Sequence, residues 1–219
     1  MNVAIVDYGV GNLFSLTCSF KAVGQDVRVT SDADVLRAAD AVVLPGVGAF
    51  GDAIDALRAT GLDAVVCEVA ASGKPLLGIC LGMQMLFDRS YEYGIHQGLG
   101  LIPGEVRSLK EVVDPGMLVP HIGWNALHLA SGEGVSSEGP VKAGGPLFSQ
   151  VGEGAYVYFV HSFHATACEA HTIATTDYGA PVTAAVQRDN VFGCQFHPEK
   201  SGAVGLKILT SFCDLAKEA

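Results

Sequence analysis

The sequence predicts an α/β fold in which parallel strands first alternate with helices and antiparallel strands follow in the C-terminal half. In the N-terminal half, short continuous apolar runs such as residues 3–6 and 41–44 are typical of strands buried in a parallel sheet. Segments with helical spacing of apolar residues follow these runs. In the C-terminal half, short strand-like runs are joined by tight turns. A chain of 219 residues, 49% of them hydrophobic, is long enough to bury the core of one such domain.

The elements of the N-terminal half follow from the spacing of their apolar residues. From Leu13 to Val23, apolar side chains recur three or four positions apart, as they do on one face of a helix. Gly9 and Gly11 lie just before this segment, but a Gly-x-Gly pair without a third glycine is too weak to indicate a dinucleotide site. The expected strands are residues 3–6, 27–30, 41–44 and 76–79, and the expected helices are residues 13–23, 52–71 and one that begins at residue 81.

The composition changes after residue 87, where glycine and proline become frequent. Residues 130–145, rich in glycine and serine, are the best candidate for a mobile loop. The dipeptide Asp189-Asn190 separates two strand-like runs and therefore predicts a β-hairpin. The expected strands of this half are residues 124–129, 156–160, 172–178, 183–188 and 191–196, followed by an amphipathic helix over residues 205–217.

Charge and cysteine content exclude several classes of function. The formal net charge of −10 argues against binding to nucleic acid or to an anionic membrane, both of which need a basic surface. The six cysteines show neither a C-x-x-C pair nor the Cys/His spacing of a metal site, so we expect no metal and reduced thiols. No signal peptide and no membrane-spanning run is evident, which favours a cytoplasmic protein. Charged residues make up only 16% of the chain, which suggests that apolar surface meets a partner.

Residues 76–87 carry the clearest chemical signal. Gly78-Ile79-Cys80-Leu81-Gly82 joins a strand to a helix and has the form of a nucleophile elbow with cysteine in place of serine. The glycines allow a tight bend, and the N-terminus of the following helix would favour the thiolate of Cys80. A single cysteine in an apolar run is usually a small buried hydrophobe, and it is the flanking glycines that raise Cys80 above that expectation.

A base for this thiol lies near the C-terminus, in His197-Pro198-Glu199. A thiol nucleophile needs an imidazole to take its proton, and the imidazole needs an acceptor that fixes its tautomer. The residue before a proline is biased toward an extended conformation, so His197 and Glu199 should keep a fixed relation. His-Pro-Glu alone is a common loop tripeptide. Combined with the elbow cysteine, it predicts a Cys80–His197–Glu199 triad.

A glycine-rich loop follows the third expected strand, in Pro45-Gly46-Val47-Gly48. Loops at the carboxyl ends of parallel strands are where α/β proteins bind ligands. Glycines there free backbone N–H groups to stabilise an oxyanion. On this loop alone, an ordinary surface turn is an equally good interpretation.

The elbow and the His-Pro-Glu motif together resemble the class I (triad) glutamine amidotransferases. Further motifs resemble the branch of this family that serves histidine biosynthesis, and the resemblance extends from end to end of the chain. These motifs are Asp7-Tyr8-Gly9-Val10-Gly11-Asn12, Pro45-Gly46-Val47-Gly48, the run from Gly98 to Gly104, His121-Ile122-Gly123-Trp124-Asn125, Tyr158-Phe159-Val160-His161-Ser162 and the run from Cys194 to Ser201.

The resemblance implies a fold and a set of roles. The fold would be a three-layer α/β structure with a central, mostly parallel sheet, formed by residues 1–219 as one domain. Cys80 would form a glutamyl thioester, His197 would move the proton and Glu199 would orient His197. No cofactor is implied. The oxyanion would be held by backbone N–H groups of Leu81 and of Gly46, Val47 and Gly48, and L-glutamine would be bound by Gly48, Gln84, Ser162 and Phe163.

The resemblance also implies a partner, a cyclase subunit with a (β/α)8-barrel fold that forms a heterodimer with this chain and receives its ammonia. Asn12, Trp124, Tyr158 and Lys200 would face that subunit. An aromatic pair beside the rim of a site also suits an interface, although Trp124 could instead be a core aromatic. Two other hypotheses remain: an amidotransferase that serves anthranilate or guanine synthesis, and a binding or sensor protein whose elbow cysteine does not turn over.

Overall fold

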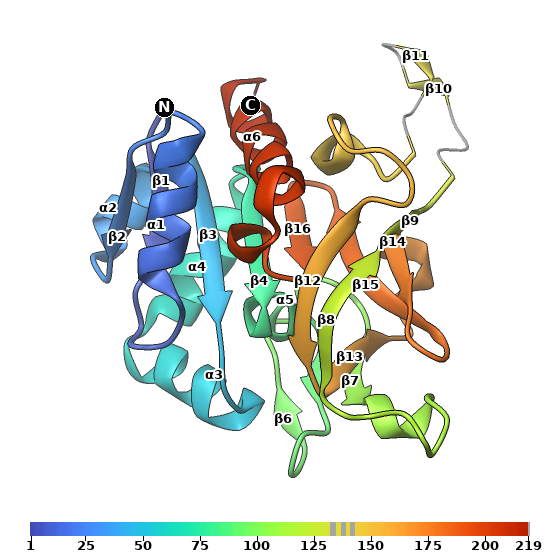
Figure 1. The fold of residues 1–219 in the computed structure, drawn as a ribbon. Helices are drawn as coiled ribbons and strands as arrows, with labels where there is room; N and C mark the ends of the chain where they lie inside the picture. The colour runs from blue at the N-terminus through green and yellow to red at the C-terminus, as the bar shows by residue number, and fades with distance from the viewer. Residues whose placement is uncertain (132–134, 137–138, 141–142, 219) are drawn as a thin grey trace.

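An eight-stranded sheet forms the centre of the molecule (Figure 1). The computed structural model describes residues 1–131, 135–136, 139–140 and 143–218. In spatial order the strands of the sheet are β2 (Val27–Thr30), β1 (Val3–Val6), β3 (Ala41–Gly46), β4 (Leu76–Cys80), β16 (Val191–Cys194), β15 (Pro181–Arg188), β14 (Thr172–Asp177) and β9 (His128–Leu129). Neighbouring strands are parallel from β2 to β16 and antiparallel from β16 to β9.

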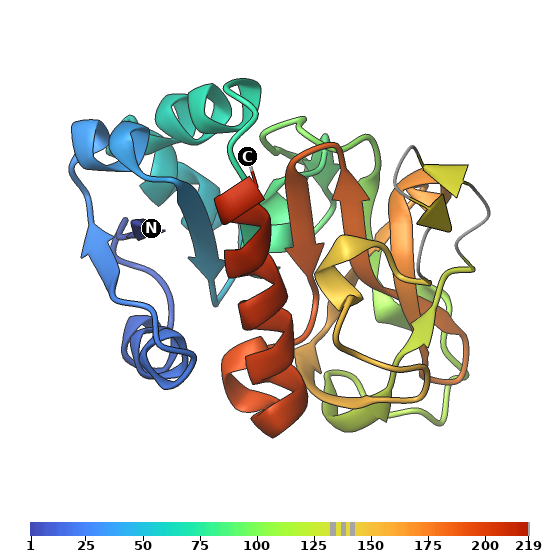
Figure 2. The same ribbon diagram turned by 90° about the horizontal axis from the view of Figure 1, so that it is seen from above.

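Helices cover both faces of the parallel half of the sheet, which gives three layers (Figure 2). The helices α1 (Leu13–Ala22) and α6 (Gly202–Glu218) contact each other on one face. The helices α2 (Ala33–Ala38), α3 (Phe50–Ala59) and α4 (Leu62–Ala71) pack together on the other. The short helix α5 (Leu81–Met85) follows β4 directly.

Alternate residues of the strands feed two separate hydrophobic cores. Val3 and Ile5 of β1 pack with Leu16 and Phe20 of α1 and with α6. Their neighbours Ala4 and Val6 point the other way and pack with α2, α3 and α4. A strand buried on both faces has no reason to alternate apolar with polar residues. This burial explains why the sequence of β1 is a continuous apolar run.

The longest helix, α6, closes the first core. Gly205, Ile208, Leu209, Phe212 and Cys213 are all buried. Their spacing of three and four positions places them on one stripe of the helix, which faces the sheet. Among the described residues, no helix combines the length and apolarity needed to cross a lipid bilayer.

Smaller sheets and short helices extend the antiparallel side. A ribbon pairs β8 (His121–Ala126) with β12 (Tyr156–His161), with Tyr158 opposite Trp124 and His161 opposite His121. A four-stranded sheet has the order β13 (Phe163–Thr166), β7 (Glu105–Ser108), β5 (Arg89–Ser90) and β6 (His96–Gln97). The remaining elements are the pair β10 (Val135–Ser136) and β11 (Gly139–Pro140), and the 3-10 helices η1 (Leu109–Glu111), η2 (Pro146–Phe148), η3 (Glu169–His171) and η4 (Pro198–Lys200).

The α/β prediction is confirmed, and three of the elements that the sequence predicted differ in the structure. The helix expected over residues 52–71 is two helices, α3 and α4, because Gly61 between them has a φ of 71°. The strand expected over residues 124–129 is divided between β8 and β9. The helix after Cys80 is only five residues long. The loop predicted over residues 130–145 lies partly outside the described residues.

The contact between α5 and β3 gives a test of the fold. A Cβ atom on Gly82 would lie 1.9 Å from the carbonyl oxygen of Leu44, so that backbone would have to move. We expect Gly82→Ala to lower the free energy of unfolding by about 2 kcal/mol or more, the cost of overpacking a core. Gly152→Ala is the matched control, since no atom lies within 4 Å of a Cβ placed there. Urea denaturation of both variants measures the effect, and equal stability of the two would contradict the described packing.

Candidate active site

Cys80 is the last residue of β4, and its backbone is held in an unusual conformation. It has a φ of 54° and a ψ of −112°, a region that costs a non-glycine residue about 1–3 kcal/mol. The glycines on either side make the bend possible. A Cβ atom on Gly78 would lie 2.8 Å from the carbonyl oxygen of Gly82, and one on Gly82 would enter the backbone of Leu44. The Gly-x-Cys-x-Gly spacing is therefore a packing requirement of this turn.

His197 and Glu199 come from the strand beside the elbow. β16 pairs with β4 in parallel, with Cys194 opposite Ile79, and His197 and Glu199 follow its carboxyl end. The backbone N–H of His197 donates to the carbonyl of Tyr158 at 3.0 Å. Nδ1 of His197 lies 2.8 Å from Oε1 of Glu199, with side chains only 3% and 1% exposed. The structure therefore brings all three predicted triad residues to one edge of the sheet.

The electrostatics of His197 suit a proton carrier next to a sulfur nucleophile. Burial alone would lower its pKa, but hydrogen bonds and charge attraction from Cys80 and Glu199 outweigh burial and raise the pKa to about 9. At neutral pH the imidazole is therefore protonated. A buried imidazolium between a sulfur and a carboxylate is paired on both sides, which is what makes its charge tolerable there.

A cavity of about 360 Å³ opens onto Cys80. Its walls hold residues from the elbow, the glycine-rich loop and the segment after β12, and they include Val47, Gly48, Cys80, Leu81, Gln84, Ser162, Phe163 and His197. The cavity thus gathers most of the residues that the sequence assigned to catalysis, the oxyanion and glutamine. Gly46 lies just outside it, opposite Cys80 in the pairing of β3 with β4.

The lining also includes Glu92, which the sequence analysis missed. Glu92 is 9% exposed, and its Oε2 accepts the backbone N–H of Phe50 at 2.7 Å at the start of α3. Burial raises the pKa of its carboxyl group, and the bond from Phe50 and a nearby histidine, His96, act against that. Its sequence context, Ser-Tyr-Glu-Tyr-Gly, matches no motif, so no local signal could have identified it.

Two glutamine side chains, Gln84 at the cavity and Gln195, are joined by a hydrogen bond in which Gln84 is the donor. Nε2 of Gln84 donates to the carbonyl of Phe163 and to Oε1 of Gln195, both at 2.9 Å. Nε2 of Gln195 in turn lies 3.8 Å from Sγ of Cys80. Because both N–H groups of Gln84 are used, its oxygen is left for the cavity. Gln195 was not singled out in the sequence, where it lies two positions before His197, the first residue of the His-Pro-Glu motif.

The glycine-rich loop is supported from the first strand. Tyr8, just after β1, donates its hydroxyl to the carbonyl of Pro45 at 2.8 Å and is itself buried. Gly48 has a φ of 93°, which favours glycine. Val47, Gly48 and Leu81 reach the cavity, as an oxyanion site would require. Their role in binding an oxyanion stays a prediction.

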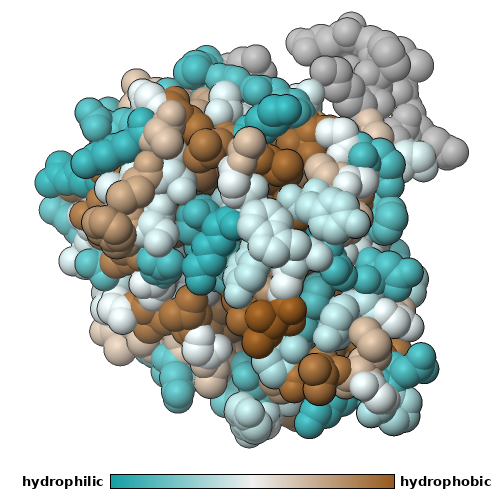
Figure 3. Space-filling model, viewed as in Figure 1, coloured by the Kyte–Doolittle hydropathy of each residue, from teal (hydrophilic) through white to brown (hydrophobic). Residues whose placement is uncertain are grey.

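The residues expected to face a partner lie around the β8–β12 ribbon and the start of α1. Trp124 is 51% exposed, so it is not a core aromatic. Its ring meets Tyr158 edge-on, and Nζ of Lys200 lies 5.8 Å from the centre of the Tyr158 ring. Asn12 caps α1 by accepting the N–H of Ser15. The face of the molecule that carries the ribbon shows hydrophobic patches interspersed with polar surface (Figure 3).

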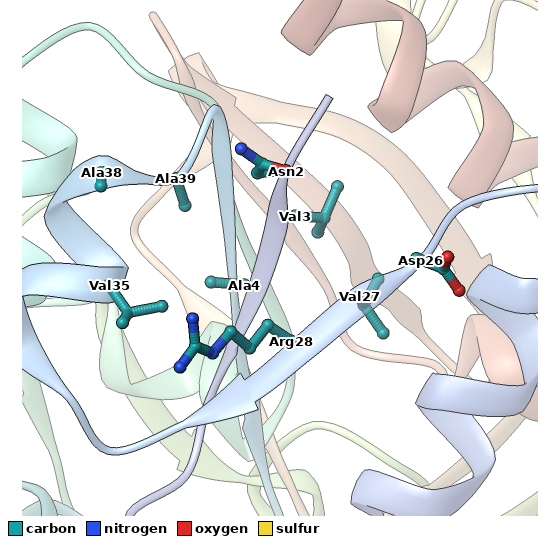
Figure 4. A pocket seen from close by; sticks show the side chains of 9 residues that line it. All are labelled: Asn2, Val3, Ala4, Asp26, Val27, Arg28, Val35, Ala38 and Ala39. Carbon is teal, nitrogen blue, oxygen red and sulfur yellow. The ribbon is translucent and has the colours of Figure 1, made fainter.

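A second cavity, of about 370 Å³, lies at the opposite end of the strands (Figure 4). Its lining is mostly aliphatic, from β1, β2 and α2, with Asn2, Asp26 and Arg28 as its polar members. None of the residues that line it is a cysteine or a histidine. It therefore offers neither a thiol nor an imidazole, and the cavity at Cys80 is the candidate active site.

The raised pKa of His197 predicts a pH dependence with a definite sign. A group whose pKa rises on folding stabilises the folded state fully below its unfolded value of about 6.5, and that stability is lost as the pH rises through the folded value of about 9. We expect the free energy of unfolding to fall across this window. In Cys80→Ala the His197 titration should move to lower pH, because one of the two supports of the imidazolium is gone. Urea denaturation at a series of pH values measures the fall in the free energy of unfolding, and NMR titration of the His197 ring measures the midpoint. An unchanged midpoint in Cys80→Ala would contradict the pairing.

The chain is similar to known proteins along nearly its whole length. Residues 4–214 match the family described as Glutamine amidotransferase class-I. A relative from Lacticaseibacillus casei (strain BL23), named imidazole glycerol phosphate synthase subunit HisH, is 46% identical over 99% of this chain and 97% of its own. A relative of the same name from Listeria monocytogenes serotype 4a (strain HCC23) is 43% identical over 96% of this chain and 94% of its own.

Solved structures of low sequence identity share the fold. A structure of PurLQS from Thermotoga maritima aligns with a TM-score of 0.68 at 19% identity, covering 97% of each chain. A structure titled as a glutamine amidotransferase aligns with a TM-score of 0.70 at 18% identity, covering 98% of each chain. The three-layer fold is therefore that of this group of enzymes. Because the family model matches nearly the whole length of this chain, the chain belongs to the class-I glutamine amidotransferases.

Proposed function

We propose that the chain is the glutaminase subunit of an imidazole glycerol phosphate synthase, which hydrolyses L-glutamine and passes the ammonia to a cyclase subunit. The observation that carries the chemistry is the meeting of Cys80 and His197 at one cavity, with Glu199 bonded to His197 at 2.8 Å. The choice of pathway is supported by relatives named HisH, 43–46% identical along nearly the whole chain.

The first half of the reaction uses the paired charges of Cys80 and His197. The thiolate of Cys80 attacks the side-chain amide carbon of glutamine, forming a C–S bond and placing the electron pair of the carbonyl on its oxygen. His197 then gives its proton to the amide nitrogen as the C–N bond breaks, and ammonia leaves. A glutamyl thioester remains on Cys80. Glu199 holds the imidazole so that its other nitrogen faces the sulfur.

The second half restores the enzyme. His197, now neutral, takes a proton from water as the water oxygen attacks the thioester carbon. The C–S bond breaks, glutamate leaves, and the thiolate and imidazolium form again. In both halves, negative charge develops on the former amide oxygen. The backbone N–H groups of Leu81 and of the Gly46–Gly48 loop are the donors proposed to bind it, because both segments adjoin Cys80.

Recognition of glutamine needs partners for its ammonium and carboxylate groups and for its amide. Glu92 is the acidic side chain among the residues that line the cavity, so it suits the ammonium group. Gln84 lines the cavity and both of its N–H groups are already engaged, so its oxygen is the atom proposed to accept a hydrogen bond from the substrate. The backbone at Ser162 and Phe163 and the N–H of Gly48 complete the proposed pocket.

The partner is proposed to be a cyclase subunit with a (β/α)8-barrel fold, bound as a heterodimer. It would combine ammonia with a phosphorylated nucleotide intermediate and give imidazole glycerol phosphate and the aminoimidazole carboxamide ribonucleotide. The exposed Trp124 and the half-buried Tyr158 beside the catalytic cavity supply the aromatic anchors that such an interface needs. Lys200 adds a cation at the same rim.

Replacing the nucleophile separates the two activities of the complex. We expect Cys80→Ala to lower glutamine-dependent synthesis by at least about a thousandfold, since the covalent route is lost, and to leave ammonia-dependent synthesis unchanged. Cys18→Ala, at an exposed cysteine on α1, is the matched control. The assay uses the chain with a barrel cyclase, and with an anthranilate or guanine synthase subunit for comparison. If an anthranilate or guanine synthase subunit, and not the cyclase, activated the glutaminase, the chain would belong to another pathway. Loss of both glutamine-dependent and ammonia-dependent synthesis in Cys80→Ala would count against ammonia delivery.

Replacing Glu92 tests substrate recognition. Glu92→Gln keeps the acceptor for the N–H of Phe50 but removes the charge. Since a hydrogen bond to a charged group contributes about 1.5–3 kcal/mol, we expect the KM for glutamine to rise about 10- to 100-fold. Glu169→Gln, at an exposed position on η3, is the control. Steady-state glutaminase assays would show an unaltered KM if Glu92 did not contact the substrate.

A further inference from the structure

Two buried histidines outside the triad are bonded to each other beneath the active site. His121 on β8 and His161 on β12 face one another across the ribbon, with Nδ1 of His121 3.1 Å from Nε2 of His161. They are 1% and 6% exposed. Neither has a part in the chemistry described above. His161 nevertheless lines the glutamine cavity, and His121 is bonded to it.

The direction of the protons in this pair is fixed by a backbone carbonyl. Nδ1 of His161 lies 2.8 Å from the carbonyl oxygen of Phe163, which can only accept, so this nitrogen carries the proton. Burial lowers the pKa of His161 to about 3 and that of His121 to about 4, so both rings are neutral at neutral pH. Nε2 of His161 is therefore an acceptor, and Nδ1 of His121 must be the donor to it.

The carbonyl of Phe163 connects His161 to the substrate pocket. The oxygen of Phe163 also accepts Nε2 of Gln84 at 2.9 Å, so both of its lone pairs are used. Gln84 then donates to Gln195, which reaches the sulfur of Cys80. An unbroken series of hydrogen bonds therefore runs from β8 to the nucleophile, with the Phe163 carbonyl as the acceptor that both halves share. Its members turn the oxygen of Gln84 toward the cavity.

The surroundings of His121 indicate that its N–H is what the site uses. Its ring is stacked between Phe159, with centroids 4.8 Å apart, and Tyr178, at 3.9 Å. Its Nε2 is buried and has no hydrogen-bond partner among the described atoms. An unpartnered buried nitrogen is costly, and a phenylalanine would fill the stack without it. What histidine provides here and phenylalanine cannot is the donor at Nδ1.

We propose that His121 and His161 are positioning residues that fix the Phe163 carbonyl and, through it, the side-chain amide of Gln84 in the glutamine pocket. The inference rests on the proposed glutaminase function. Without the donor of His121, the ring of His161 loses one of its two fixed contacts, and the carbonyl that orients Gln84 loses its support. The effect should fall on glutamine binding and not on the reactivity of the thiol.

Two substitutions of His121 separate its hydrogen bond from its packing. His121→Phe keeps the stacked ring and removes the donor, whereas His121→Asn keeps a donor close to the position of Nδ1 and removes the ring. In the complex with the cyclase, we expect His121→Phe to raise the KM for glutamine about tenfold, with ammonia-dependent synthesis unchanged. His121→Asn should stay within about threefold of wild type. His128→Phe, at a histidine on β9 paired with Glu153 on the surface, should have no effect.

Alkylation of Cys80 by iodoacetamide, which does not need the glutamine pocket, should proceed at the wild-type rate in His121→Phe. A wild-type KM in this variant, or an equal rise in both variants, would overturn the positioning role while the glutaminase function stood. An inactive wild-type complex would instead refute the proposed function.

The wild-type protein offers a test that no misfolded variant can obscure. Long-range ¹H–¹⁵N spectra of the histidine rings identify which nitrogen carries the proton. We expect both His121 and His161 to be neutral and protonated at Nδ1. A His161 ring protonated at Nε2 would break the series of hydrogen bonds at its second bond and overturn the inference.

Discussion

The left-handed backbone of Cys80 is the constraint on which the site depends. With a φ of 54°, it ends β4 abruptly and turns the sulfur toward the cavity. A conformation that costs about 1–3 kcal/mol persists only when its surroundings determine it. Here they do so by close packing, since Gly46, Gly78 and Gly82 bring the backbones of β3, β4 and α5 closer than any side chain would allow. The strain at the nucleophile is thus supported by three glycines in the scaffold.

The parallel register of three strands converts that local bend into a catalytic arrangement. β3, β4 and β16 lie side by side, so Gly46, Cys80 and the His197 segment end at one edge. Charge then selects the protonation state, because His197 lies between a sulfur and a carboxylate and keeps its proton at neutral pH. His121 and His161, which also lie near the site, are buried without a carboxylate partner and stay neutral. The same side chain therefore serves as a proton carrier at one position and as a fixed hydrogen-bond donor at another.

The sequence predicted those parts of the molecule that have a regular pattern of apolar residues or a short contiguous motif. The parallel strands were visible because β1 and β3 are buried on both faces and read as continuous apolar runs. The elbow and the His-Pro-Glu motif were visible because each is contiguous in the chain. Glu92, Gln195 and the His121–His161 pair were not identified as members of the site, because their importance comes from contacts with residues distant in sequence. The division of residues 52–71 into α3 and α4 was missed because one left-handed glycine interrupts an otherwise unbroken helical pattern.

The central claim is that Cys80, alone among the six cysteines, is the nucleophile of a glutamine site. The most direct measurement is mass spectrometry of the wild-type complex after treatment with a chloroketone that mimics glutamine, with and without excess glutamine. We expect one adduct, on Cys80, formed more slowly when glutamine is present. Labelling of another cysteine, or labelling of Cys80 that glutamine does not slow, would contradict it.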